Sequence, residues 1–325
     1  MTIFNNKRSI FLVAFLMGIV SFVLCGFTLR DNSAEDGNRE TADAALTETA
    51  DSKDMETEFR PFSFLWITDT QAIAYLDGMY EKLGNVCTEY IENNNVVYFF
   101  GTGDYVGRSY FSEHWAGFQK MYKRISVPKI MVAGNHDISA ERKSEKEQAI
   151  DIFLEQIYGE KPTSERYYKN GLGVYDLFSA GGSDWIVIGM HFEYGEEELN
   201  WMDRVLKQYP DRKAVLLLHD YANGDRTLMP QGSRLYKKVV VPNENVRLIL
   251  CGHCHGKYAW KQRPNKESDR FVVTIMYNFQ DSKRYKGAPI LLTIDPKEQK
   301  LHLDAYPFIG GVGHIQYDTD IDLNE

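Results

Sequence analysis

Residues 62–71 read FSFLWITDTQ, and they contain the pattern on which the fold prediction rests. A short apolar run, rich in aromatic and β-branched side chains, is followed at once by Asp69 and Gln71. Near-continuous apolarity over six or seven residues predicts a strand that is buried on both faces. A carboxylate directly after such a strand lies at the edge of its sheet, where it is available to a hard divalent cation.

The same kind of apolar run recurs along the chain, at residues 96–100, 129–132, 185–190, 214–218 and 246–250. Helical periods of apolar residues lie between several of these runs, over 79–90, 115–125, 150–157 and 199–209. Strands that alternate with amphipathic helices predict a layered α/β domain. Three later runs, at 271–276, 289–294 and 301–306, have no helical period between them, and we expect a β meander that completes a second sheet.

Polar side chains of metal-ligand type follow these runs in a fixed order. They form five clusters: Asp69-Thr70-Gln71, Gly103-Asp104, Gly134-Asn135-His136-Asp137, His219, and Gly252-His253-Cys254-His255. Each cluster alone is weak, because a lone histidine at a strand end is more often structural than a ligand. As an ordered set of carboxylates, amides and imidazoles, they predict a site for two divalent ions, the arrangement that hydrolyses phosphate esters.

In this order of motifs the chain resembles the calcineurin-like metallophosphoesterases, over about residues 60–307. The resemblance implies a four-layered α/β sandwich of two mixed β-sheets flanked by helices. It also implies two divalent metal ions, with Mn, Fe and Zn all suited to mixed nitrogen and oxygen ligands. One ion would be held by Asp69, Gln71 and His255, and the other by Asn135, His219 and His253. Asp104 would bridge the two.

The resemblance further implies a phosphoric ester hydrolase that attacks a phosphomonoester or phosphodiester with a hydroxide activated by the two ions. His136 would be the catalytic imidazole and protonate the leaving oxygen, and Arg108 would bind the substrate phosphate. A locally bonded turn histidine and a plain surface arginine are the alternatives. Gly107 stands where the protein phosphatases have an aspartate that orients this histidine, so His136 needs another partner. Gln71 replaces the commoner histidine and is a weaker ligand.

The N-terminal 58 residues differ in character from the rest. Lys7 and Arg8 precede an apolar stretch over residues 10–29, so residues 1–29 are expected to be a signal sequence or a membrane or lipid anchor. Cys25 stands where a lipoprotein would be modified. Residues 30–58 are acidic, which predicts a disordered tether. Residues 59–325 are expected to form the metallophosphoesterase domain. We therefore expect the protein to be exported to a periplasmic, secreted or membrane-anchored location. The run 277–281 supports this, because it resembles the corresponding run of exported bacterial members of the family.

Charge and cysteine content exclude other classes of function. The formal charge is −9, of which residues 59–325 contribute only −4, and no clustered basic face predicts nucleic-acid binding. We expect a small phosphate ester as the partner, and membrane contact only through the N-terminal segment. Cys251 and Cys254 match the spacing of a thiol-disulfide exchange motif, but the residues that follow them predict an aromatic and basic loop where that motif needs a helix. A catalytically impaired ligand-binding protein on the same fold is the second hypothesis.

Overall fold

A computed structural model describes residues 59–323, except 141, 161, 267–268 and 311–312. The signal sequence or anchor predicted for residues 1–29 and the tether predicted for 30–58 lie outside the described residues. Among the residues that the structure describes, no helix is long and apolar enough to cross a membrane.

The first sheet has six strands in the order β13-β12-β11-β1-β2-β3. Its parallel half consists of β1 (Phe62–Ile67), β2 (Val96–Gly101) and β3 (Lys129–Met131). On the other side of β1, an antiparallel meander adds β11 (Ile290–Asp295), β12 (Lys300–Ala305) and β13 (Ile315–Asp320). Parallel strands are joined by helical crossovers, so their carboxyl ends meet at the same edge of the sheet.

The second sheet has seven strands in the order β4-β5-β6-β7-β8-β10-β9. Its parallel centre consists of β6 (Ser183–Met190), β7 (Lys213–Leu218), β8 (Val246–Cys251) and β10 (Val272–Asn278). The antiparallel strands β4 (Tyr167–Tyr168), β5 (Gly173–Ala180) and β9 (Gly256–Gln262) lie at its two edges.

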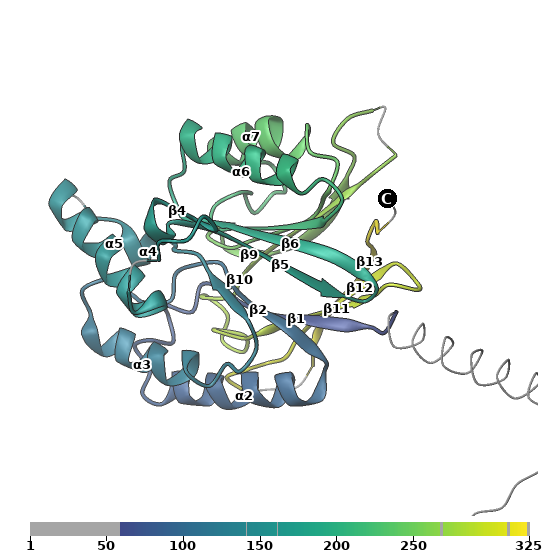
Figure 1. The fold of residues 1–325 in the computed structure, drawn as a ribbon. Coiled ribbons are helices and arrows are strands. Elements are labelled where there is room, and N and C mark those ends of the chain that lie inside the picture. Colours follow the sequence, from purple (N-terminus) through teal and green to yellow (C-terminus); the bar gives the residue numbers. More distant parts are fainter. Residues whose placement is uncertain (1–58, 141, 161, 267–268, 311–312, 324–325) are drawn as a thin grey trace, which may run out of the picture. The chain divides into compact units, whose positions relative to one another are not determined.

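Helices cover the outer faces of both sheets, as Figure 1 shows. On one side lie α2 (Met79–Asn93) and α3 (Ser112–Tyr122), and on the other α6 (Glu196–Gln208) and α7 (Pro230–Leu235), which continues into η2 (Tyr236–Val240). The short α4 (Asn135–Ile138) and the longer α5 (Lys143–Tyr158) follow β3, and a single turn η1 (Lys169–Gly171) follows β4. This arrangement confirms the predicted fold class of two mixed β-sheets flanked by helices.

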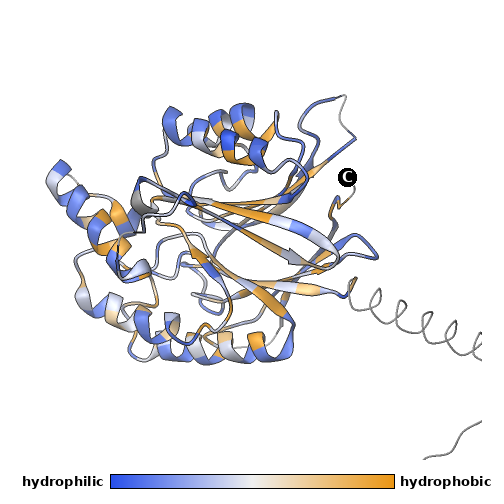
Figure 2. Cartoon of the chain, viewed as in Figure 1, coloured by the Kyte–Doolittle hydropathy of each residue, from blue (hydrophilic) through white to orange (hydrophobic). Residues whose placement is uncertain are grey.

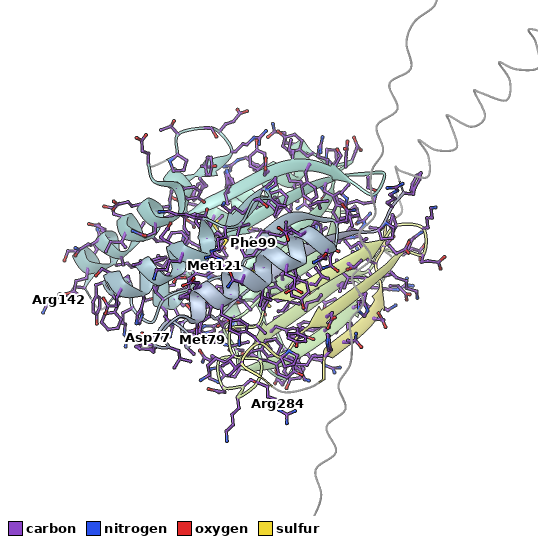
Figure 3. All side chains as sticks on the ribbon, turned by 90° about the horizontal axis from the view of Figure 1, so that it is seen from below. Asp77, Met79, Phe99, Met121, Arg142 and Arg284 are labelled. Carbon is purple, nitrogen blue, oxygen red and sulfur yellow. The ribbon has the colours of Figure 1, made fainter. Side chains whose placement is uncertain are left out.

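The central strands are buried on both faces, which explains their continuous apolarity. On β6, Trp185 and Val187 belong to the larger core, which includes residues of both sheets, whereas Ile186 and Ile188 pack in the second core with α6 and α7. Alternate side chains of a strand point to opposite faces, so both sets must be apolar. Figure 2 shows the apolar residues concentrated along the strands and on the sheet-facing sides of the helices. Figure 3 shows the molecule from the side of α2 and α3. It labels two buried residues, Phe99 of β2 and Met121 of α3.

Two expectations about the C-terminal part are wrong. The meander does not complete the second sheet, because β11, β12 and β13 return to the first sheet and pair beside β1, while β10 alone joins the second. The segment after His255 is also no loop, since β9 begins at Gly256 and pairs along its length with β10. Local periodicity cannot tell which edge a strand will join, because that depends on which edge is still unpaired in space.

Candidate metal centre

The predicted ligands lie at the carboxyl ends of strands from both sheets. Asp69 follows β1, Asp104 follows β2, and Asn135 opens α4 after β3. His219 follows β7, and His253 follows β8. Backbone hydrogen bonds join neighbouring loops of each sheet: Asp69 N–H donates to Gly103 O at 3.0 Å, and Gly252 N–H donates to His219 O at 3.0 Å. The two sheets therefore bring five separate chain segments to one place.

Three of the ligand residues have left-handed backbone conformations. The φ angles are 50° at Asp69, 59° at Asp104 and 65° at His253. A residue other than glycine in this region costs free energy, and such residues persist at sites where the surrounding structure holds them. Here each one directly follows, or nearly follows, the end of a strand, and the turn it makes takes its side chain out of the alternation of that strand.

Two glycines allow the loops after β2 and β3 to come together. A Cβ atom on Gly103 would lie 2.5 Å from the nitrogen of Gly134, and one on Gly134 would lie 2.2 Å from Oδ1 of Asp104. Gly103 also has a φ of 98°, a conformation that suits glycine. Any side chain at these positions would push apart the segments that carry Asp104 and Asn135.

Asp137 joins the same two loops through its buried carboxylate. Its oxygens accept hydrogen bonds from four backbone N–H groups, those of Gly134, Asp104, Tyr105 and Val106, at 2.7 to 3.3 Å. Acceptor oxygens of a carboxylate satisfy buried N–H groups without needing a donor in return. The fourth residue of the Gly-Asn-His-Asp motif is therefore a structural residue that holds the loops of Asp104 and Asn135 in register.

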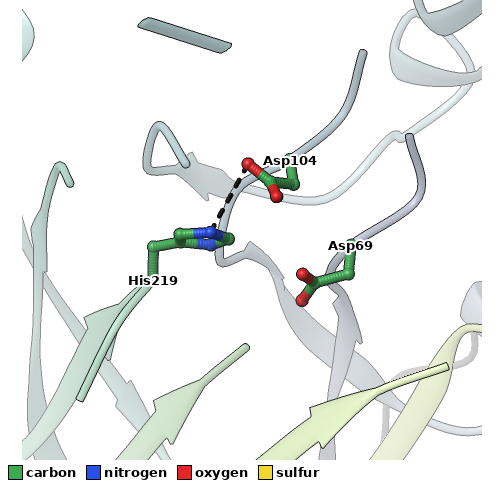
Figure 4. Close-up of side chains that lie close together, drawn as sticks. All are labelled: Asp69, Asp104 and His219. Atoms are coloured by element: carbon green, nitrogen blue, oxygen red, sulfur yellow. Dashed lines mark ion pairs between the residues drawn. The ribbon is translucent and has the colours of Figure 1, made fainter. Parts of the chain in front are cut away.

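Asp69, Asp104 and His219 form a buried cluster in which one ligand atom from each lies within 4.8 Å of the others. Figure 4 shows the three side chains converging from separate strand ends. Nε2 of His219 lies 3.4 Å from Oδ1 of Asp104. Among the described residues, this is the group of histidine, cysteine and acidic side chains that has the spacing of a metal site.

Asn135 and His253 extend this cluster on one side. The Oδ1 atom of Asn135 lies 3.0 Å from Nε2 of His219 and 2.9 Å from Nδ1 of His253, and these two nitrogens lie 3.2 Å apart. Metal–ligand bonds of about 2.1 Å separate neighbouring donors by about 3.0 to 3.4 Å in octahedral or tetrahedral sites. The spacing of these three donors fits a single divalent ion.

Gln71 and His255 lie on the other side and are arranged differently. The amide nitrogen of Gln71 donates to Oδ2 of Asp104 at 3.1 Å and to Oε1 of Gln280. His255 is half exposed and lies outside the cluster of three; its Nε2 contacts the amide nitrogen of Gln280, and its Nδ1 lies 2.5 Å from Asp281. Gln280 therefore links the two predicted ligands of this half.

Sequence reasoning missed the contribution of residues 278–281 to the site. Asn278, at the end of β10, donates through its side-chain amide to Oδ1 of Asp69 and to the carbonyl of His253, both at 2.8 Å. From sequence, this run was linked only to export. The position of an Asn-x-Gln-Asp group directly after an apolar strand is the same signal that identified the other clusters, and it would have found this one.

The buried charges of the site depend on one another. Burial opposes the charged form of His219, but the carboxylates of Asp104 and Asp69 outweigh it and raise the pKa of the imidazole to about 10. Burial acts to raise the pKa of Asp104. The charge of His219 and its hydrogen bond to Asp104 outweigh burial, so the pKa of Asp104 lies below its usual value. Burial raises the pKa of Asp69 to about 7.

His253 shows the opposite shift to His219. Burial, together with the positive charge of His219, lowers its pKa to about 4. These shifts favour a neutral His253 beside a protonated His219 at neutral pH.

His136 has an orienting partner that the sequence did not reveal. Its Nδ1 atom lies 2.9 Å from the carbonyl oxygen of Gly107. A carbonyl can only accept, so Nδ1 carries a hydrogen, and Nε2 is left to take up or release the second proton. The backbone of Gly107 thus contacts the imidazole where the resemblance to the protein phosphatases led us to expect an aspartate side chain. A Cβ atom on Gly107 would lie 2.2 Å from the hydroxyl of Tyr75, so an aspartate there would have to displace that ring.

Arg108, the residue after Gly107, lines a surface hollow of about 570 Å³. Its walls also include Tyr110, Ser139 and Gln148, and Ser139 directly follows the helix that begins at Asn135. Arg108 is the next residue in the chain after the carbonyl that contacts His136.

The model of the calcineurin-like phosphoesterase family matches residues 62–257, more than half of the chain. The chain belongs to the calcineurin-like phosphoesterase family. This membership confirms the predicted family. The matched residues extend from β1 to the first residues of β9 and include all the predicted ligands, but not Asn278 or Gln280.

Known proteins similar to this calcineurin-like phosphoesterase include YvnB of Bacillus subtilis strain 168, an uncharacterised protein that is 30% identical over 274 residues. The alignment covers 80% of this chain and 21% of YvnB, so the chain spans about a fifth of the length of the curated relative it matches. Purple acid phosphatase PPD1 from yellow lupin seeds shares the fold, with a TM-score of 0.56 at 12% identity, over 80% of this chain and 54% of the lupin protein. A dimetal phosphatase from Danio rerio has a TM-score of 0.48 at 14% identity, over 78% and 98% of the two chains.

Membership of the calcineurin-like phosphoesterases implies a centre of two divalent metal ions, and the residues present fit such a centre. Two carboxylates, amide groups and imidazoles converge on this centre. Asp104 lies between the side that carries Gln71 and the side that carries His219: its Oδ2 contacts Gln71, and its Oδ1 lies near His219. The Oε1 atom of Gln71 is buried and has no hydrogen-bond partner in the described part of the chain. A buried carbonyl oxygen without a partner is unfavourable unless a ligand uses it.

The thiol-exchange hypothesis finds no support in the same region. Burial raises the pKa of both the Cys251 and the Cys254 thiol, whereas a nucleophilic thiol needs a lowered pKa. Both cysteines are free, and the chain continues into strand β9 where an exchange motif would begin a helix.

Proposed function

We propose that the chain hydrolyses a small phosphomonoester or phosphodiester with two divalent ions, Mn, Fe or Zn, at the centre around Asp104. The observation that carries the proposal is the convergence of five oxygen and nitrogen donor side chains from both sheets around this one buried carboxylate, those of Asp69, Gln71, Asn135, His219 and His253. When bound, the ions would neutralise the phosphoryl oxygens and lower the pKa of water so that hydroxide is available at neutral pH.

The residues of the chain divide between the ions and the substrate. Asp69, Gln71 and His255 would hold one ion, and Asn135, His219 and His253 the other. The remaining work is to position the ester and to supply a proton to the leaving oxygen. The hydrogen bond from Nδ1 of His136 to Gly107 leaves Nε2 of that imidazole as the atom that delivers the proton.

Arg108 would bind a phosphate oxygen or an anionic group on the leaving side of the ester. Its side chain is exposed, no partner of its guanidinium is seen in the described residues, and it lines the surface hollow together with Tyr110 and Ser139. A guanidinium can donate two parallel hydrogen bonds to a phosphate. A volume of about 570 Å³ suits a small organic group rather than a macromolecule.

Turnover by the purified full chain tests the proposed activity. After removal of metal by chelation, p-nitrophenyl phosphate and bis-p-nitrophenyl phosphate are offered with added Mn²⁺, Fe²⁺ or Zn²⁺. We expect p-nitrophenol to be released from at least one of them only when metal is present. Absence of turnover with every metal, together with metal-dependent binding of a phosphate ester, would favour the ligand-binding hypothesis.

We also propose that the protein is exported. The basic residues Lys7 and Arg8 and the apolar stretch 10–29 support this, and Cys25 supports a lipid-anchored form. Mass spectrometry of the N-terminus after expression in a bacterial host distinguishes a cleaved, a lipidated and a retained segment. Recovery of an intact, unmodified N-terminus in the cytoplasm would contradict export, and fatty-acid labelling that survives Cys25→Ser would contradict modification at that residue.

A further inference from the structure

We propose that His114 is a positioning residue for His136, because it holds in place the backbone carbonyl that orients the His136 imidazole. The inference rests on the proposed function, in which His136 delivers a proton to the leaving oxygen of the ester. It concerns a histidine that lies outside the five clusters of candidate ligands.

His114 and His136 contact the two backbone groups of one residue, Gly107. Nδ1 of His136 donates to the carbonyl oxygen of Gly107 at 2.9 Å, and the N–H of Gly107 donates to Nδ1 of His114 at 3.1 Å. His136 follows β3 and His114 lies in the first turn of α3, so two separate segments of the chain meet at this glycine. Since glycine has no side chain to restrict its backbone, the direction of its carbonyl depends on the groups that hold the residue from either side.

The contact with His114 completes a series of hydrogen bonds along the loop after β2. The successive N–H groups of residues 104–106 all donate to the carboxylate of Asp137, and the next N–H, that of Gly107, donates to His114. Asp137 thus holds the loop as far as residue 106, and His114 holds the residue that follows. Gly107 is buried, and a buried N–H without an acceptor is unfavourable, so loss of the imidazole would move Gly107 to a new position.

The imidazole of His114 is itself held in place. It is 5% exposed, and the rings of Tyr75 and Phe111 meet it edge-on, with ring centroids 4.5 and 4.9 Å from its own. Because Nδ1 of His114 accepts a hydrogen bond, the neutral ring carries its hydrogen on Nε2. Burial lowers the pKa of His114, which favours this neutral form. The two histidines therefore use opposite tautomers, since His136 carries its hydrogen on Nδ1.

The consequence for catalysis concerns Nε2 of His136. As the bond between phosphorus and the leaving oxygen breaks, the proton on Nε2 passes to that oxygen, and His136 is left neutral with its hydrogen on Nδ1. A shift of the Gly107 carbonyl would turn the ring, and a misplacement of about 1 Å can lower a rate by about 100-fold. The loss should depend on the ester, because a weakly basic oxygen leaves without a proton and a strongly basic oxygen does not.

Two substitutions of His114 separate this role from packing. His114→Phe keeps an aromatic ring beside Tyr75 and Phe111 but removes the acceptor, whereas His114→Asn loses the ring and keeps an acceptor, its Oδ1, at the position of Nδ1. We expect His114→Phe to lower kcat for phenyl phosphate roughly 10- to 100-fold with little change of KM, and to lower kcat for p-nitrophenyl phosphate less than about threefold. His114→Asn should stay within about threefold of the parent protein for both esters. A role in packing alone would give the opposite order of the two variants.

Proton–nitrogen NMR tests the same role without turnover. The full chain, with isotope-labelled histidine and loaded with diamagnetic Zn²⁺, is measured at alkaline pH. The signals of His114 and His136 are assigned by their loss in His114→Asn and His136→Gln. We expect the hydrogen of His114 on Nε2 and that of His136 on Nδ1, and in His114→Phe we expect His136 to lose its preference for Nδ1.

The outcomes that would overturn the inference are specific. They are a hydrogen on Nδ1 of His114, or a loss of kcat for phenyl phosphate in His114→Asn that equals or exceeds the loss in His114→Phe. Circular dichroism checks that both variants fold, and the parent spectrum alone decides the tautomers if they do not. His302→Phe, on β12, is the control and should leave kcat, KM and the tautomer of His136 unchanged. A parent protein that turns over neither ester would instead count against the proposed activity, and the NMR measurement would still decide the role of His114.

Discussion

Metal binding to this centre is expected to release protons, and the number released can be worked out from the structure. The pKa of His219 is raised to about 10, so at pH 7 its imidazole is protonated in the metal-free protein. The Nε2 atom that faces Asn135 and His253 must lose its proton before it can bind an ion. Asp69, with a pKa of about 7, is half protonated at that pH, whereas His253, with a pKa of about 4, holds no proton.

The sign and the size of the pH dependence follow from these values. Protons compete with the ion for His219, so apparent affinity rises with pH, by about tenfold per unit between pH 7 and 8.5. The pKa of His219 lies roughly three units above pH 7. At about 1.4 kcal/mol per unit, the loss of this proton costs about 4 kcal/mol of the free energy of metal binding. Loading should release at least one proton per molecule at pH 7, the one held by His219, and Asp69 and any water ionised by the ions add to it. The contribution of Asp69 should vanish as pH rises, because this carboxyl is then already ionised.

Titration calorimetry measures this release directly. The full chain is loaded with Mn²⁺ at one pH in two buffers of different ionisation enthalpy, and the difference in observed heat gives the protons released. His219→Gln, which replaces the imidazole by a side chain that carries no titrating proton, should release about one proton fewer. His302→Gln, the same exchange on β12, should release as many as the parent protein. Release near zero at pH 7.5, or an affinity that does not change between pH 6.5 and 8.5, would refute the reasoning.

Further predictions concern individual side chains. Asp104→Ala should abolish metal-dependent turnover and lower the number of bound ions, since this carboxylate contacts both halves; normal two-ion occupancy by mass spectrometry would contradict the bridging role. His136→Ala should lower kcat by about 10²- to 10⁴-fold while two ions still bind, which kinetics and metal counting check together. Arg108→Ala should raise KM by roughly 10- to 100-fold, the effect of one lost hydrogen bond to a charged group, while Arg204→Ala on α6 leaves KM unchanged. Cys254→Ser should retain turnover, and loss of activity in that variant would revive the thiol hypothesis.

Much of the fold was predictable because its central strands are buried on both faces. Runs such as 185–190 and 214–218 are continuously apolar for that reason, and the helices between them carry one apolar stripe each. The antiparallel edge strands were harder to predict. β5 and β9 lie at or next to the margins of the second sheet and are only partly buried, so their sequences are less continuously apolar than those of the central strands.

The candidate ligand positions and their order along the chain could be read from the sequence itself, because polar residues of metal-ligand type follow several buried strands as an ordered set, which one such residue alone would not show. The tertiary structure alone decided how these residues are oriented. The partner of His136 is a backbone carbonyl at Gly107, and a carbonyl leaves no mark in a sequence. Gln280 reaches Gln71 across 209 positions of the chain because β10 and β1 end at the same place in space. Contacts of this kind depend on which strand ends meet, and only the folded sheets determine that.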